Sequence, residues 1–418
     1  MFDEKLIRLS YDTEAKIEDI FKRYEIIAFN NQIKVLNAFK KYKISDIHFN
    51  STSGYGYDDI GREIIDHVFA EVFGAEDCIV RHNIISGTHA LATALFGVLR
   101  PGDVMLSVTG KPYDTLEEVI GIRGEKGNGS LEDYGISYHQ IDLKDGKIDF
   151  QSIKEYFEKN KVKMVFIQRS KGYLDRPSLN IENIKEISEF VKGIQKDVIV
   201  MVDNCYGEFV EEKEPTEAGA DLMAGSLIKN PGGGMAETGG YIAGKKDLIT
   251  LCSYRLTSPG IGKEVGATLN QNKNIIKGLF FAPHVVKEAI KTSVFAAALY
   301  ESLNFEVEPS YNAKRTDIIS SIKFNDKEKL IAFCQGVQMG SPIDSHVLPE
   351  PWEMPGYSDE VIMAAGTFTQ GASIELSADA PIKQPYIAYL QGGLTYESGK
   401  FGILSSCNNL IEKGLIKL

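Results

Sequence analysis

The chain has 418 residues, of which 43% are hydrophobic and 25% charged, a composition typical of globular domains and a length that favours two or three structural units. Its formal net charge of −12 argues against a nucleic-acid partner and against an anionic membrane surface. No apolar stretch reaches the ~18 residues of a membrane span. The cysteines are dispersed and the first residues lack the pattern of a signal peptide, so we expect a cytoplasmic protein.

The apolar spacing predicts a helix over residues 12–43, a glycine- and tyrosine-rich loop over 51–62, and a helix over 62–73. From residue 79 short apolar runs alternate with helical stretches, which indicates a parallel sheet with helices on both faces. The predicted strands are 79–85, 104–108, 136–141, 164–168 and 198–202, and the helices between most of them are 90–99, 115–122, 150–159 and 181–192.

The pattern changes near residue 290, where a helix over 293–303 leads into a polar stretch rich in glycine and proline. Such a change favours a smaller α+β domain after the main α/β domain. We therefore predict an N-terminal helical segment over 1–50, a large domain over 51–290 and a small C-terminal domain over 291–418.

Two residues carry most of the functional signal. Asp203 ends the apolar run 198–202, and Lys229 follows in a turn that leads into three glycines. Parallel sheets gather ligands at the carboxyl ends of their strands. Pyridoxal 5'-phosphate (PLP) requires a carboxylate for its pyridinium nitrogen and a lysine for its aldehyde. Alone, each residue has an ordinary explanation, a strand-end cap and an exposed lysine; together they predict a PLP enzyme.

Further residues supply the other groups that PLP needs. Gly87 and Thr88 open a predicted helix directly after a strand, so their N–H groups suit a phosphate, although a plain helix cap is the alternative. Ser226 adds a hydroxyl three residues before Lys229. Tyr206 is a candidate donor to the ring oxygen. The remaining candidates are Tyr113 for stacking on the ring, with His89 as its competitor, and Arg62 as a second phosphate ligand, each against an ordinary packed or solvated residue.

Other classes of site fit less well. The seven histidines are dispersed without the spacing of metal ligands, so no metal site is expected. The glycines after Lys229 lack the lysine–serine pair or the G-x-G-x-x-G pattern of a nucleotide-binding loop.

The sequence blocks in combination resemble one family. The blocks are 54–59, 86–90, 202–209 and 225–233, followed in the tail by 371–379 and 389–396. They resemble the bacterial aluminium resistance proteins, also described as cystathionine β-lyase-like or methionine γ-lyase-like, over nearly the whole chain. The resemblance implies a fold type I PLP enzyme, similar to aspartate aminotransferase. That fold has a large domain with a mixed, mostly parallel seven-stranded sheet between helices, and a small C-terminal α+β domain.

The resemblance also implies a homodimer or homotetramer with shared active sites, in which a tyrosine and an arginine of the neighbouring subunit reach the phosphate. By analogy these would be Tyr57 and Arg62, although their spacing is wider than in the related lyases. The substrate carboxylate usually binds an arginine of the small domain, but residues 323–418 contain none. Lys383 and Arg255 are the alternatives.

The expected activity is elimination from a sulfur-containing amino acid such as cystathionine or methionine, a carbon–sulfur lyase reaction. Lys229 would remove the α-proton while Asp203 keeps the ring nitrogen protonated. An aldolase, an aminotransferase and a non-catalytic protein of the same fold stay open as alternatives.

Overall fold

A computed structural model describes residues 2–174, 176–354 and 359–418, which form two compact units. The larger unit contains Ile33–Leu227 and Met235–Phe280, and the smaller one contains the described residues of Met1–Gln32, Ile228–Gly234 and Phe281–Leu418. Helix α1 (Glu4–Lys41) and helix α8 (Asn272–Ser302) each run through both units. The predicted boundary at residue 290 therefore falls inside a continuous helix.

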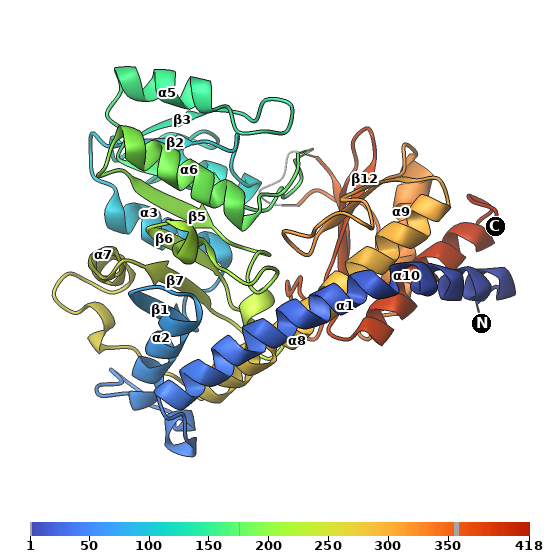
Figure 1. Ribbon diagram of the computed structural model, residues 1–418, viewed down its shortest axis with the longest axis horizontal. Helices are drawn as coiled ribbons and strands as arrows, with labels where there is room; N and C mark the ends of the chain where they lie inside the picture. The colour runs from blue at the N-terminus through green and yellow to red at the C-terminus, as the bar shows by residue number, and fades with distance from the viewer. Residues whose placement is uncertain (1, 175, 355–358) are drawn as a thin grey trace. The chain divides into compact units, whose positions relative to one another are not determined.

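The larger unit is built on a seven-stranded sheet with the order β1-β7-β6-β5-β4-β2-β3 (Figure 1). Strands β3, β2, β4, β5 and β6 run parallel, whereas β7 pairs antiparallel with both β6 and β1. The predicted mixed, mostly parallel seven-stranded sheet is confirmed. The strands are β1 (Asp77–Arg81), β2 (Val104–Ser107), β3 (Ser137–Gln140), β4 (Met164–Gln168), β5 (Ile199–Asp203), β6 (Leu222–Ser226) and β7 (Gly240–Gly244).

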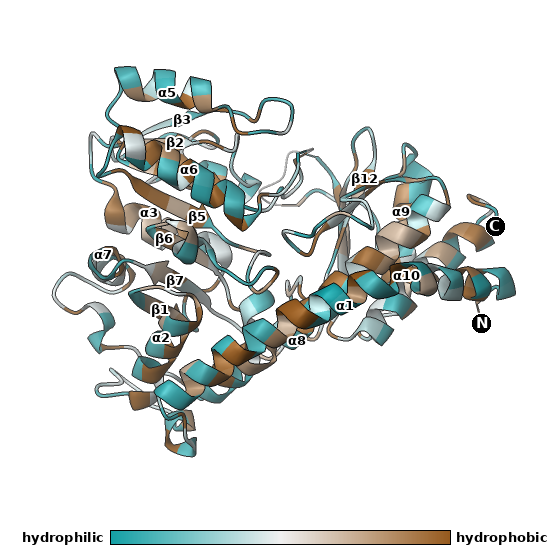
Figure 2. Ribbon diagram, viewed as in Figure 1, coloured by the Kyte–Doolittle hydropathy of each residue, from teal (hydrophilic) through white to brown (hydrophobic). Residues whose placement is uncertain are grey.

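Burial explains the sequence pattern of these strands. Every residue of β4 and β5 is buried, as expected for central strands of a sheet that is covered on both faces. Apolar residues of α3 share one buried core with Met105, Phe166 and Met201 of the sheet. Helix α6 alternates apolar and polar colouring along its length in Figure 2. The helices of this unit are α2 (Ile60–Val72), α3 (Gly87–Val98), α4 (Asp114–Ile120), α5 (Phe150–Lys159), α6 (Ile181–Ile194) and α7 (Lys246–Leu256).

The smaller unit is α+β, as predicted. Its five-stranded antiparallel sheet has the order β10-β11-β12-β9-β8. Helices α9 and α10 pack closely. A Cβ atom on Gly336 would lie only 2.4 Å from the Cα atom of Ser406. The elements are β8 (Glu306–Glu308), β9 (Ser320–Lys323), α9 (Lys327–Met339), β10 (Val361–Ala364), β11 (Ser377–Pro381), β12 (Ile387–Gln391) and α10 (Tyr396–Glu412).

Candidate active site

The carboxyl ends of three neighbouring parallel strands define the centre of the candidate site. Asp203, the last residue of β5, lies opposite Gln168 of β4 and Ala224 of β6. Asp203 is only 6% exposed, and its Oδ1 accepts a hydrogen bond of 3.1 Å from the Cys205 N–H. The acid therefore stands at the sheet edge that the sequence predicted, and its carboxylate is oriented by the turn that follows it.

The predicted phosphate turn lies next to this edge. Ser86 caps α3 by accepting a hydrogen bond from the backbone of His89, and the first turn of the helix contains no acidic residue. A Cβ atom on Gly87 would lie 3.0 Å from Cys205 Sγ and 3.7 Å from Ser226 Cβ. The positive end of the α3 dipole therefore meets the turn after β5 and the end of β6, which suits an anionic group.

Thr88 and Tyr113 lie on the adjoining elements. The Thr88 hydroxyl is 2.6 Å from that of Thr115, which links the first turns of α3 and α4. Tyr113 precedes α4, and its ring centroid is 5.8 Å from that of Tyr173. Its competitor His89 instead accepts a hydrogen bond of 3.2 Å from the Ile85 N–H through Nδ1. Thr88, in the first turn of α3, and Tyr113, just before α4, thus lie at the helix starts that follow β1 and β2.

Tyr206 stands in a backbone conformation that a tyrosine rarely adopts. Its φ is +72°, and Phe209 three residues later has a φ of +61°. Such angles cost free energy for a residue with a side chain, so the surrounding structure must impose them. Tyr206 is half-buried three residues after Asp203. The predicted role of its hydroxyl beside the ring oxygen stays a prediction.

Lys229 follows β6 and precedes a short 3-10 turn, Asn230–Gly232. It is half-buried, and its carbonyl accepts a hydrogen bond of 3.2 Å from the Gly232 N–H. Gly233 and Gly234 then adopt φ angles of +51° and +70°, a region that glycine occupies without strain. A Cβ atom on Gly234 would lie 2.5 Å from Leu394 Cδ2. The glycines are therefore required by a sharp turn and a close approach, directly after the lysine.

Arg62 is held by its own chain. It is 2% exposed, and its guanidinium donates to the carbonyl oxygens of Gly56 at 2.6 Å, Gly266 at 2.9 Å and Glu264 at 3.3 Å. These contacts bind the loop 51–59 to the loop 262–270. The structure thus gives Arg62 a bracing role within its chain, and phosphate binding by this residue stays a prediction. Tyr57, in the braced loop, is 65% exposed.

The two candidates for the substrate carboxylate differ in position. Arg255 is exposed near the end of α7 and lies over the Phe96 ring at 4.9 Å. Phe96 is in the last turn of α3, about 13 Å along the helix from Gly87. Arg255 therefore does not belong with the strand-end residues. Lys383 of the smaller unit is exposed and forms an ion pair of 3.3 Å with Asp359. Arg315 of that unit is fully buried and donates to the Pro309 carbonyl.

The loop that follows β4 was not predicted as part of the site. Arg169, Ser170 and Lys171 are all buried at the carboxyl edge of the sheet, next to the strand that ends in Asp203. A Cβ atom on Gly172 would lie 3.0 Å from the Tyr113 ring, so this loop packs against the predicted stacking residue. The signal was available, because three polar residues directly follow the predicted strand 164–168.

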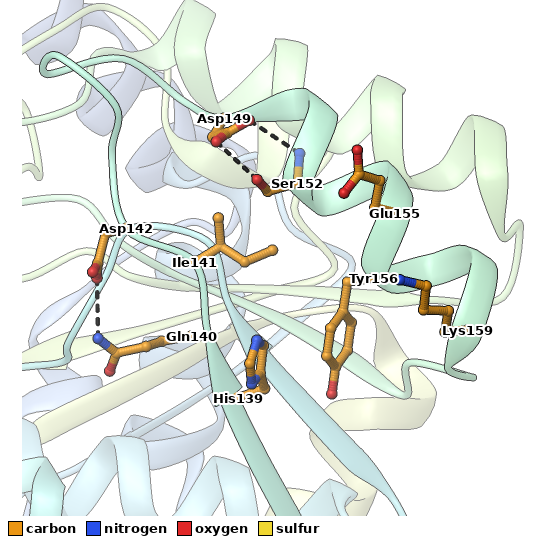
Figure 3. Close-up of a pocket in the computed structure, with 9 residues that line it drawn as sticks. All are labelled: His139, Gln140, Ile141, Asp142, Asp149, Ser152, Glu155, Tyr156 and Lys159. Atoms are coloured by element: carbon orange, nitrogen blue, oxygen red, sulfur yellow. Dashed lines mark hydrogen bonds between the residues drawn. The ribbon is translucent and has the colours of Figure 1, made fainter.

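A surface pocket of about 470 Å³ lies elsewhere in the larger unit (Figure 3). It is lined by residues of β3 and α5, including His139 and Tyr156, whose rings stack at 4.5 Å. Strands β4 and β2 separate β3 from β5, so the pocket contains none of the predicted site residues. In the described ranges no cluster of side chains could hold a metal ion, and no helix is long and apolar enough to cross a membrane.

Comparison with known proteins places this chain in a family. The profile described as Methionine gamma-lyase matches residues 6–411. The chain belongs to the methionine gamma-lyase family. It is 56% identical to the uncharacterized protein YnbB of Bacillus subtilis, over all of both chains.

Solved structures agree with this assignment. A protein from Clostridium novyi NT, described as a carbon–sulfur lyase involved in aluminum resistance, is 54% identical with a TM-score of 0.95, over 98% of this chain and 96% of that one. The pyridoxal-5'-phosphate-dependent protein YhfS from Escherichia coli is 15% identical with a TM-score of 0.62, over 92% and 96% of the two chains, and shows the shared fold alone. The fold is therefore that of the fold type I PLP enzymes.

The residues of the larger unit fit such a cofactor. A cradle at Gly87 that a side chain would fill, the positive end of the α3 dipole and the buried hydroxyl of Ser226 suit a phosphate. A buried carboxylate at Asp203 suits a protonated ring nitrogen, since an acid in that place keeps the nitrogen charged.

Proposed function

We propose that the protein is a PLP-dependent carbon–sulfur lyase that acts on a sulfur-containing amino acid by β- or γ-elimination. The observation that carries the proposal is the convergence of Gly87, Cys205 and Ser226 at the strand edge that ends in Asp203. The membership of the methionine gamma-lyase family supports the reaction class. Cystathionine and methionine are the substrates to test first.

The residues of the proposed site have distinct tasks. Gly87, Thr88 and Ser226 bind the phosphate, Asp203 holds the proton on the ring nitrogen, and Tyr206 donates to the ring oxygen. Tyr113 stacks on the ring. Lys229 would hold the cofactor through its ε-amine, and that amine would take the substrate α-proton. When bound, PLP supplies the electron sink that stabilises the resulting negative charge. Lys383 is the proposed contact of the substrate carboxylate.

The decisive experiment is the near-visible absorbance of the purified protein with added PLP, before and after borohydride, with mass mapping of the reduced adduct. We expect an absorbance band that borohydride removes and an adduct on Lys229. The Lys229→Ala variant should retain its fold and lose the adduct. A colourless wild type that takes up no PLP would contradict the proposal.

The products then separate the lyase from its relatives in the same fold. Elimination consumes water and releases a 2-oxo acid, a thiol and ammonia, whereas an aminotransferase needs an acceptor 2-oxo acid and an aldolase releases an aldehyde. We expect pyruvate or 2-oxobutyrate from sulfur amino acids. A protein that binds PLP on Lys229 and yields only amino-group transfer would overturn the lyase assignment.

We further propose that active sites are shared in a homodimer or homotetramer, with Tyr57 acting as a catalytic residue toward the neighbouring subunit's phosphate. Its exposure of 65% within the chain is consistent with a contact outside it. Mixing the Lys229→Ala and Tyr57→Ala variants tests this, because a hybrid dimer would have one site with both residues intact. Random pairing predicts recovery of about a quarter of the wild-type sites in a symmetric dimer. No recovery on mixing, with exchange of subunits demonstrated, would contradict shared sites.

A further inference from the structure

Arg169 is the first residue after β4, and its guanidinium contacts three separate segments. It is 0% exposed. It donates to Asn204 Oδ1 and to the Gly207 carbonyl, both at 2.9 Å, and to Glu211 Oε2 at 2.9 Å. Its Nε donates to the Leu179 carbonyl at 3.3 Å. A single side chain thus joins the turn after β5, the segment that follows that turn and the chain entering α6.

The turn that Arg169 contacts is the one that carries the proposed cofactor residues. Asp203 precedes Asn204 directly, and Tyr206 lies between the two residues to which Arg169 Nη1 donates. The Arg169 N–H also donates to the Asp203 carbonyl at 3.1 Å. The guanidinium and the backbone of one residue therefore hold both ends of this turn.

This turn needs such a brace because its backbone is strained. Tyr206 and Phe209 both have positive φ angles, +72° and +61°, which side-chain-bearing residues adopt only when the surrounding structure imposes them. Gly207 leaves room for the arginine, since a Cβ atom there would lie 2.4 Å from Arg169 Nη1. The glycine and the arginine thus fit together as one arrangement.

The partners of Arg169 are themselves fixed by further hydrogen bonds. Glu211 Oε2 also accepts from the Ile181 N–H at 2.9 Å, at the start of α6. Glu214 accepts from Asn204 Nδ2 at 2.9 Å and from the Phe209 N–H at 2.9 Å. Burial raises the pKa of Glu214, and the nearby Arg169 charge opposes that rise. The network is buried and hydrogen-bonded throughout the turn, which is what a precise position requires.

We propose that Arg169 is a positioning residue that sets the orientation of the Asp203 carboxylate and the Tyr206 hydroxyl toward the cofactor. The inference rests on the proposed function for its consequence, because the value of a fixed Asp203 lies in its contact with the ring nitrogen. It assigns a role to a residue that does not itself touch PLP or substrate.

The test uses full-length Arg169→Lys, which keeps the positive charge but loses the planar, multiply donating group. Hydrogen exchange of residues 203–209 in the PLP-free protein is measured beside the dissociation constant for PLP. We expect faster exchange confined to this turn and PLP affinity weakened about tenfold or more, as loss of charged hydrogen bonds predicts. Arg315→Lys is the control, because Arg315 is equally buried at 0% exposure but lies in the smaller unit.

A milder variant covers the case in which Arg169→Lys does not fold. Glu211→Gln keeps an oxygen that accepts from Arg169 and removes the carboxylate charge of residue 211. We therefore expect a smaller increase in exchange at 203–209 and a smaller loss of PLP affinity. Unchanged exchange at 203–209 together with unchanged PLP affinity in a folded variant would refute the positioning role. If the wild type binds no PLP, the proposed function fails, while the exchange data still report whether Arg169 holds the turn.

Discussion

Two loops of the larger unit are braced by a buried arginine, yet they present their tyrosines in opposite ways. Arg169 holds the turn 203–207, where Tyr206 is half-buried. Arg62 holds the loop 51–59, where Tyr55 and Tyr57 are 73% and 65% exposed. Both arginines donate to backbone carbonyls, so both loops have a defined backbone. The difference lies in how exposed the tyrosine side chains are.

The partners of the two arginines explain part of this difference. Arg169 pairs with the carboxylate of Glu211 at 2.9 Å, so its charge is neutralised inside the unit. Arg62 donates to three carbonyl groups, and burial lowers its pKa from the ordinary value. A loop can therefore be rigid without burying its side chains. Such a loop offers aromatic groups at low entropic cost to a contact beyond its own chain, as the shared-site proposal requires.

The largest effect is expected at Gly207. A Cβ atom there would lie 2.4 to 2.7 Å from three atoms of the Arg169 side chain, which cannot move without breaking buried hydrogen bonds. Gly207→Ala should lower the free energy of unfolding by about 3 kcal/mol. Gly193→Ala is the control, since nothing lies within 4 Å of its Cβ position in α6 and alanine favours a helix. Urea unfolding measures both; equal stability of the two variants would show that Arg169 is not tightly held.

The loop braced by Arg62 offers a matched pair of glycines for a smaller effect. Gly54 and Gly56 have nearly equal φ angles, +61° and +59°, but only at Gly56 would a Cβ atom meet the backbone, 2.8 Å from the Gly266 carbonyl oxygen. Gly54→Ala should cost about 1 kcal/mol from backbone strain alone, and Gly56→Ala about 2 kcal/mol because the two loops must also separate. Thermal unfolding of both variants checks the order, and a reversed order would mean that the loops are not in contact.

The elements of the larger unit differ in how far the sequence could predict them. The strand 164–168 and the helix 150–159 were predicted with the observed bounds, because each has an unbroken pattern. Strand β7, Gly240–Gly244, was missed as an element, since only Tyr241 and Ile242 of its five residues favour a strand. Its glycines are explained by close packing, because a Cβ atom on Gly244 would lie 2.1 Å from the Asp221 carbonyl oxygen.

The site shows the same limit. Asp203, Gly87 and Ser226 could be placed from sequence because strand ends and helix starts have recognisable patterns. The brace from Arg169 to Glu211 could not, since it joins residues 42 positions apart through side-chain geometry. Arg62 was predicted as a phosphate ligand because guanidinium groups bind phosphate, and that role stays a prediction. Its use on three carbonyls depends on the loop 262–270, whose position no local pattern reveals.

The smallest effect concerns the pH dependence of the loop 51–59. Burial alone would raise the pKa of Asp59, but hydrogen bonds from Thr52, the Arg62 backbone and Thr268 outweigh it and lower that pKa. A carboxylate whose pKa is lower in the folded protein stabilises the fold. Its contribution is complete when the pH is above the unfolded pKa of about 3.9, and it is lost as the pH falls through the folded pKa.

Asp59→Asn keeps a good helix cap and removes the charge, so it isolates this contribution. We expect it to cost about 1 kcal/mol at pH 7 and pH 5, with the difference from wild type shrinking at pH 3.5 and below. Urea unfolding at these pH values measures it. A difference that stays constant with pH would mean that the Asp59 charge does not stabilise the loop, and that Arg62 and the backbone hydrogen bonds alone hold Tyr57 in place.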